Sequence, residues 1–89
     1  HHSFIFIKMY YVYILYSRTK DRYYVGYTHN IEIRLSKHNA GATPSTRGGR
    51  PWELVYSEEY IDKSSALFRE REIKSKKSRK YIEHLVAKG

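Results

Sequence analysis

The stretch YYVYILYSRTKDRYYVGYT, residues 10–28, decides the fold. It contains two runs that are rich in aromatic and β-branched residues, from Tyr10 to Tyr16 and from Tyr23 to Thr28. Such runs are typical of β-strands. The polar residues between them, 17–22, favour a turn. The stretch therefore predicts a β-hairpin.

The alternation of side chains along a strand predicts which residues share a face of this hairpin. A loop at 18–21 would pair Ser17 with Arg22. In this register Tyr13 lies opposite Gly26, and Tyr24 is its diagonal neighbour on the same face. Gly26 has no side chain to pack in the strand, which suggests that another group approaches the backbone there. An aromatic pair beside a bend in the sheet would give the same pattern.

The rest of the chain predicts three helices and one more strand. The expected elements are a helix capped by Asn30 and ending near His38 or Asn39, a strand at 52–60, a helix capped by Asp62 or Ser64 and ending near Lys74, and a helix capped by Ser78. Glycines and prolines at 40–51 predict an irregular loop. The expected fold class is α+β, in the order β-β-α-β-α-α, with a three-stranded antiparallel sheet packed with helices.

The length and composition limit the classes of protein. Eighty-nine residues suit a single domain, which we expect at 9–87, and the two leading histidines indicate a tag remnant or extension at 1–8. The absence of cysteine excludes disulfides and thiolate zinc sites and fits the cytoplasm. The apolar run 4–7 is too short to cross a membrane, so no membrane association is expected.

The charge points to a polyanionic partner. The net charge is +8 and the pI is near 9.8, which favours nucleic acid. The ten tyrosines include rings that could stack on bases, although many must be core residues. The run 69–80 is either part of a binding surface or a solvated helical face. The candidate nucleic-acid-binding residues are Arg47, Arg50, Arg71, Lys74, Lys76, Lys77 and Arg79.

Two polar residues of the first expected helix share a face. Arg34 and His38 are four residues apart, next to the apolar side marked by Ile31 and Leu35. We expect both side chains to emerge at the edge of the sheet. Arginine there can bind a phosphate with two hydrogen bonds, and histidine can transfer a proton near neutral pH. Each could also be an ordinary surface residue.

A carboxylate falls on the inward side of the second expected helix. Glu70 projects between Ala66 and Leu67, whereas Glu72 points to a different side. A buried carboxylate needs a counter-charge or a metal ion. A salt bridge to Arg34 or to a lysine is one explanation. A Mg²⁺ site for phosphodiester cleavage is the other.

These residues together resemble a known family. Tyr11-Val12-Tyr13, ten further residues and then Tyr24-Val25-Gly26 resemble the paired signature of the GIY-YIG nucleases, with Tyr11 in place of a glycine. Arg34 and His38 follow at the spacing of that family's arginine and histidine. The segment around Glu70 is similar to the family's metal-binding helix. The chain from residue 9 to about 86 resembles the small stand-alone bacterial members, which are related to the nuclease domain of the excinuclease C-subunit.

The resemblance implies a metal-dependent endonuclease that hydrolyses DNA phosphodiesters. It implies that Tyr13 is the general base, that Tyr24 positions the attacking water and that Arg34 stabilises the transition state. It further implies that His38 assists proton transfer and that Glu70 holds one Mg²⁺ or Mn²⁺. Two departures matter: Tyr27 stands where several members have lysine, and 74–78 lacks a proline and an asparagine that many members have. Glu72 is therefore the rival metal ligand.

Two other functions fit the same residues. One is a catalytically weak or inactive DNA- or RNA-binding module on the same fold. The other is a protein-interaction subunit that presents 69–80 to an acidic partner. If the chain is a nuclease, its size leaves no room for a separate recognition domain. We then expect weak intrinsic specificity or a need for single-stranded or structured DNA, and no small-molecule cofactor.

Overall fold

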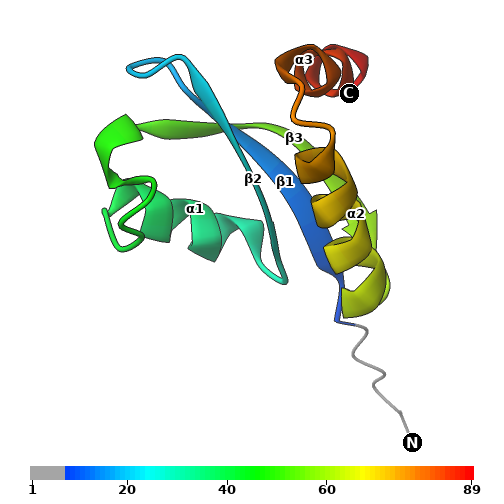
Figure 1. Cartoon of the computed structure of the whole chain (residues 1–89). Helices are drawn as coiled ribbons and strands as arrows, with labels where there is room; N and C mark the ends of the chain where they lie inside the picture. The colour runs from blue at the N-terminus through cyan, green and yellow to red at the C-terminus, as the bar shows by residue number, and fades with distance from the viewer. Residues whose placement is uncertain (1–7) are drawn as a thin grey trace, which may run out of the picture.

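The computed structural model describes residues 8–89, which form one antiparallel sheet between helices (Figure 1). The elements are β1 (Tyr10–Ser17), β2 (Arg22–Thr28), α1 (Ile31–Asn39), the short 3-10 helix η1 (Arg47–Gly49), β3 (Trp52–Tyr60), α2 (Lys63–Ser75) and α3 (Arg79–Lys88). The strand order is β2-β1-β3. The predicted α+β class and element order are confirmed. The extension expected at 1–8 lies, except for Lys8, outside the described residues.

The hairpin has the predicted register. Ser17 pairs with Arg22, and Tyr13 pairs with Gly26. β1 is the central strand and pairs with β3 along its other edge. β2 is consequently an edge strand, and a side chain from β1 that crosses Gly26 reaches the border of the sheet.

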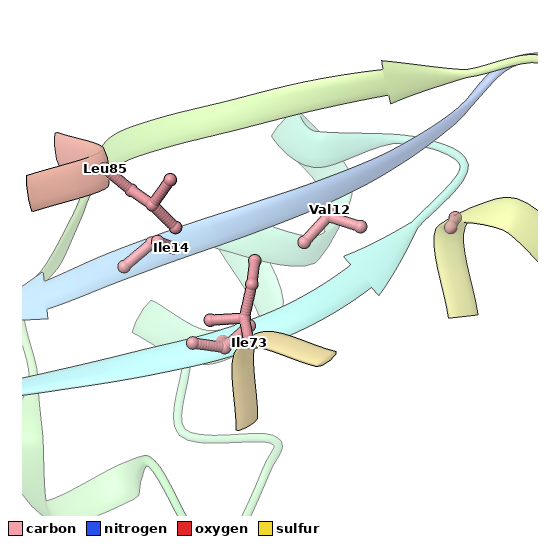
Figure 2. Packing of buried hydrophobic residues seen from close by; sticks show 6 residues of the cluster. Val12, Ile14, Ile73 and Leu85 are labelled. Carbon is pink, nitrogen blue, oxygen red and sulfur yellow. The ribbon is translucent and has the colours of Figure 1, made fainter. Parts of the chain in front are cut away.

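The alternation along β1 divides the core between the two faces of the sheet. Val12 and Ile14 pack with residues of α2 and α3, including Ile73 and Leu85. Figure 2 shows Leu85 lying beside Ile14. Tyr13 and Leu15 point to the opposite face, where α1 and Trp52 cover them. Figure 1 shows α1 on one side of the sheet and α2 and α3 on the other.

The helices are capped by residues that the sequence predicts. Asn30 accepts a hydrogen bond from the backbone of Ile33, and Ser78 accepts one from Tyr81. Of the two expected caps for α2, Asp62 is the one used. Each cap satisfies a backbone N–H that the first helical turn leaves free.

Two expectations for the connecting segments need correction. The loop 40–51 is not wholly irregular, because it contains η1 and buries Thr46. The basic run 69–80 is not one helical face, because α2 ends at Ser75 and α3 begins at Arg79. Lys77 between them has a φ of 47°, the left-handed conformation that helices do not continue through. Within the described part of the chain, no helix is long and apolar enough to span a bilayer.

A partly buried ion pair fixes α2 against β3. The Arg69 guanidinium donates two hydrogen bonds to the Glu58 carboxylate, at 2.9 and 3.0 Å. The hydroxyls of Tyr56 and Tyr60 also donate to Glu58. Burial raises the pKa of Glu58, but these hydrogen bonds and the Arg69 charge outweigh it and lower the pKa to about 2. Because Glu70 follows Arg69, the same contact sets the direction of the Glu70 side chain.

Tyr13 packs directly over the backbone of Gly26. A Cβ on Gly26 would lie 2.5 Å from the Tyr13 hydroxyl oxygen and 2.7 Å from its Cζ. The group that approaches this glycine is therefore the tyrosine of the neighbouring strand. Any larger residue at 26 would displace a ring that is only 2% exposed.

We predict that Glu58→Gln lowers the free energy of unfolding by about 3 kcal/mol, since it leaves the Arg69 charge without its partner. Glu59→Gln, on the exposed neighbouring position, should have little effect. The folded pKa of Glu58 lies below its ordinary value of 4.5, so its contribution is present above pH 4.5 and is lost as the pH falls towards 2. Urea unfolding at several pH values measures both effects. Equal stability of the two variants would contradict the prediction.

We predict that Gly26→Ala destabilises the domain by about 1–3 kcal/mol, because the added methyl group collides with the Tyr13 ring. Gly48→Ala is the matched control, since a Cβ there meets only the Lys20 side chain at 4.0 Å. Thermal unfolding compares the two. A Gly26→Ala protein as stable as Gly48→Ala would show that the ring does not occupy this position.

Candidate active site at the edge of the sheet

A chain of buried hydrogen bonds links β1 to α1 and to the loop that follows it. The Tyr13 hydroxyl lies 3.1 Å from His38 Nε2. His38 Nδ1 lies 2.8 Å from Thr46 Oγ1. Tyr13, His38 and Thr46 are all at most 2% exposed. The expectation that His38 emerges at the sheet edge is wrong: this side chain is completely buried, because its ring bridges Tyr13 and Thr46.

The direction of these hydrogen bonds follows from the third residue. Thr46 Oγ1 donates its only hydrogen to the carbonyl oxygen of Thr43, at 3.3 Å. We therefore assign it as the acceptor of a hydrogen bond from His38 Nδ1–H. Neutral His38 then has no hydrogen on Nε2, and this nitrogen accepts the hydrogen bond of the Tyr13 hydroxyl. In this tautomer Nε2 is the nitrogen that can accept a proton.

Burial determines the protonation states of this chain. Desolvation, followed by the nearby Arg34 charge, lowers the pKa of His38 and favours the neutral ring. Desolvation also raises the pKa of Tyr13, as does Tyr24, whereas the Arg34 charge lowers it and Glu70 raises it. The phenol is consequently protonated at neutral pH. A free phenolate at Tyr13 is disfavoured.

The loop 40–51 is held so that Thr46 meets the ring of His38. Trp52 Nε1 donates to the Thr46 carbonyl oxygen at 2.7 Å. The Trp52 backbone N–H donates to Asn39 Oδ1, and Asn39 Nδ2 donates back to the Trp52 carbonyl oxygen. The end of α1 and the start of β3 thus fix both ends of the loop.

Tyr24 lies beside this chain on the same face of the sheet. Its ring centroid is 4.9 Å from that of His38, 6.4 Å from that of Tyr13 and 6.3 Å from that of Trp52. Tyr24 is only partly buried. It therefore places a second phenol between the buried chain and solvent.

Arg34 and Glu70 belong to helices on opposite faces of the sheet (Figure 1). Arg34 is on α1 and exposed, and Glu70 is on α2. The Arg34 charge lowers the pKa of Tyr13, and the Glu70 charge raises it. Because β2 is the edge strand, groups on α1 and α2 can meet across its outer border (Figure 1).

The two glutamates differ as their helical positions suggest. The Glu70 side chain is 14% exposed, whereas that of Glu72 is 40% exposed and pairs with Arg69. Glu70 has a lysine partner, Lys74 Nζ at 3.3 Å, which is the structural alternative expected from the sequence. Lys74 is half exposed, so a metal ion can replace it as the positive partner of the Glu70 carboxylate.

The candidate nucleic-acid-binding residues have diverse surroundings. Arg47 donates to the Gly41 carbonyl oxygen and Arg50 to the Arg47 carbonyl oxygen, so both also brace the loop. Lys76 lies over the Tyr81 ring at 5.5 Å. Arg71, Lys74, Lys77 and Arg79 are exposed along α2, the α2–α3 junction and the start of α3. Their role stays a prediction.

Thr46 is not among the residues that the sequence pattern predicts for the site. The pattern indicates only an irregular loop at 40–51. A histidine on an apolar helix face needs partners for both ring nitrogens once it is buried. That requirement indicates that His38 Nδ1 has a partner, but it does not identify Thr46.

We predict that His38 is neutral at pH 7 with its hydrogen on Nδ1. Thr46→Val removes the acceptor for this hydrogen, so the ring should lose the Nδ1–H form, whereas Thr46→Ser should retain it. The ¹⁵N chemical shifts of the histidine rings report the tautomer directly, with the exposed His84 as an internal reference. An Nε2–H signal for His38 in the unmodified protein would disprove the assigned hydrogen-bond direction.

Comparisons with known proteins find similar chains. A UPF0213 protein of Natronomonas pharaonis is 49% identical over 78 residues, which cover 86% of this chain and 89% of that protein. One of Lactiplantibacillus plantarum is 38% identical over 84 residues, covering 91% and 82% of the two chains. The solution NMR structure of a UPF0213 protein from Bacillus halodurans matches with a TM-score of 0.57 and 36% identity, over 89% of this chain and 83% of that one.

The family comparison covers the whole site. The model of the GIY-YIG catalytic domain matches residues 9–82, a range that contains both tyrosines, Arg34, His38 and Glu70. The expected resemblance to small stand-alone proteins of this kind is also confirmed. The chain belongs to the GIY-YIG catalytic domain family.

Proposed function

We propose that this protein is a metal-dependent endonuclease that hydrolyses DNA phosphodiester bonds at the border of β2. The main support is the 3.1 Å contact between the Tyr13 hydroxyl and Nε2 of a buried His38, whose pKa is lowered, and in the assigned tautomer the hydroxyl donates. This contact gives the proton of Tyr13 an acceptor. The Tyr24 ring lies 6.4 Å from that of Tyr13, and the charges of Arg34 and Glu70 both act on the Tyr13 pKa.

The proton path follows from the hydrogen-bond directions. The attacking water loses a proton to the Tyr13 oxygen while the Tyr13 proton passes to His38 Nε2. The resulting imidazolium keeps its Nδ1–H bonded to Thr46. The raised pKa of Tyr13 makes a preformed phenolate a poor route, and a coupled transfer avoids it. The partly exposed Tyr24 orients the water.

The remaining steps need a positive charge that stabilises the transition state and a leaving group that accepts a proton. Hydroxide attacks phosphorus, the bond to one ester oxygen breaks, and that oxygen takes a proton from solvent. Arg34 is exposed on α1 and can donate two parallel hydrogen bonds to the phosphate. It stabilises the charge that builds up in the transition state.

The residues present fit one divalent cation. Glu70 supplies a largely buried carboxylate whose partner is one half-exposed lysine. Among the described residues no three histidine, cysteine or acidic side chains gather as a metal site. Mg²⁺ or Mn²⁺ at Glu70 would therefore take its other ligands from phosphate and water, as Mg²⁺ commonly does. When bound, the ion would polarise the phosphate and support the departing oxygen.

A second candidate function rests on one observation. Tyr13 is only 2% exposed, and a base must contact the attacking water. This burial favours a DNA-binding module on the same fold that does not cleave. The proposed nuclease requires the Tyr13 oxygen to become accessible beside Tyr24 when substrate binds.

Cleavage of labelled single-stranded, duplex and branched DNA in Mg²⁺ or Mn²⁺ separates the two functions. We expect nicking that stops with EDTA. Tyr13→Phe and Glu70→Gln should each reduce it by about 100-fold or more, since each removes a group that acts in the transition state.

Two matched variants serve as controls. Glu72→Gln changes the neighbouring, more exposed carboxylate, and Tyr10→Phe removes a hydroxyl on the opposite face of the sheet. Both should cleave like the unmodified protein. An equal loss of cleavage in Glu72→Gln would identify Glu72 as the metal ligand. DNA binding without nicking in either metal would establish the binding module.

A further inference from the structure

We propose that a groove between β2 and the α2–α3 junction binds an unpaired DNA strand next to the cleavage site. This inference rests on the proposed nuclease function and names its substrate class. The groove is lined on one side by residues 22–25 of β2 and on the other by Ile73, Lys74, Lys77–Arg79 and Ile82.

The rim of the groove is positively charged. Four of its lining residues are the cations Arg22, Lys74, Lys77 and Arg79, and none is a carboxylate. Such a rim attracts a phosphate backbone that runs along it. Acidic peptides would be attracted too, but the floor and the position of the groove favour DNA.

The floor of the groove is apolar. It consists of Val25 and Ile73, which are buried, and of Tyr23 and Ile82, which are partly buried. A duplex keeps its base faces stacked inside and presents phosphates and groove edges to a protein. Only a strand with exposed base faces can use an apolar floor between cations. The combination therefore selects an unpaired strand.

The groove borders the candidate active site at two residues. Tyr24 belongs to both, since it contributes to the lining and its ring lies against His38. Lys74 also belongs to both, because its ammonium group lies 3.3 Å from the Glu70 carboxylate. A strand that lies in the groove therefore ends beside the proposed metal ligand, where a phosphate must be placed for cleavage.

The four cations have different roles. Arg79 pairs with Asp21 at 2.6 Å and with Glu83 at 3.0 Å, and its guanidinium lies 5.2 Å from the Tyr23 ring centroid. It holds the hairpin against α3 and so shapes the groove. Arg22 and Lys77 form no ion pair within the described residues and are the cations available to phosphates.

The test measures binding in EDTA, so that its result does not depend on cleavage. Fluorescence anisotropy compares a labelled single-stranded oligonucleotide with the duplex of the same sequence. We expect the single strand to bind about tenfold more tightly, the effect of one base face contacting the floor. Lys77→Asn removes one phosphate contact. The slope of log Kd plotted against the logarithm of the salt concentration should therefore fall by about 0.7. Asparagine tolerates the positive φ of this position.

The control is Lys88→Asn, which removes the same charge at the other end of α3. Weaker binding in Lys77→Asn than in Lys88→Asn, with preference for the single strand, supports the proposal. Equal or tighter binding of the duplex would overturn the substrate class. Equal effects of the two variants would overturn the location. Preference for the single strand without cleavage in either Mg²⁺ or Mn²⁺ would refute the nuclease and keep the groove. Cleavage without preference for the single strand would refute the groove and keep the nuclease.

Discussion

The contact between the Tyr13 ring and the bare backbone of Gly26 is the constraint on which the site depends. The hairpin register places the two residues opposite each other, and β2 is the edge strand. The tyrosine can therefore cross the neighbouring strand and bring its hydroxyl to the border of the sheet. There it meets α1 on one face and the charge of α2 on the other. A side chain at 26 would close this passage.

Because Tyr13 is buried, its chemistry depends on its hydrogen-bond partner, His38. Desolvation makes phenolate costly, so Tyr13 cannot act alone as a base at neutral pH. The same desolvation keeps His38 neutral and able to accept a proton. In the proposed nuclease, the contact with Thr46 decides which ring nitrogen does so. The site thus combines two groups that burial holds in complementary protonation states.

The fold was predictable because local patterns agreed with the tertiary structure. The alternation of side chains in residues 10–28 predicted the register of the hairpin. Three of the four predicted helix caps are used, namely Asn30, Ser78 and, of the two alternatives for α2, Asp62. Helical geometry also gave the inward direction of Glu70. The burial of His38 and its contact with Thr46 were not predictable, because the path of the loop 40–51 depends on the Asn39 and Trp52 hydrogen bonds. Those are tertiary contacts without a local pattern.

The central claim is that side chains from both faces of the sheet share one cation and phosphate site at the border of β2. Paramagnetic broadening of NMR signals by Mn²⁺ tests it most directly. The account predicts that low Mn²⁺ broadens the ring signals of Tyr24 and His38 but spares those of His84, and that Glu70→Gln abolishes the effect. Broadening centred on Glu72 or Glu59, or unchanged in Glu70→Gln, would contradict it.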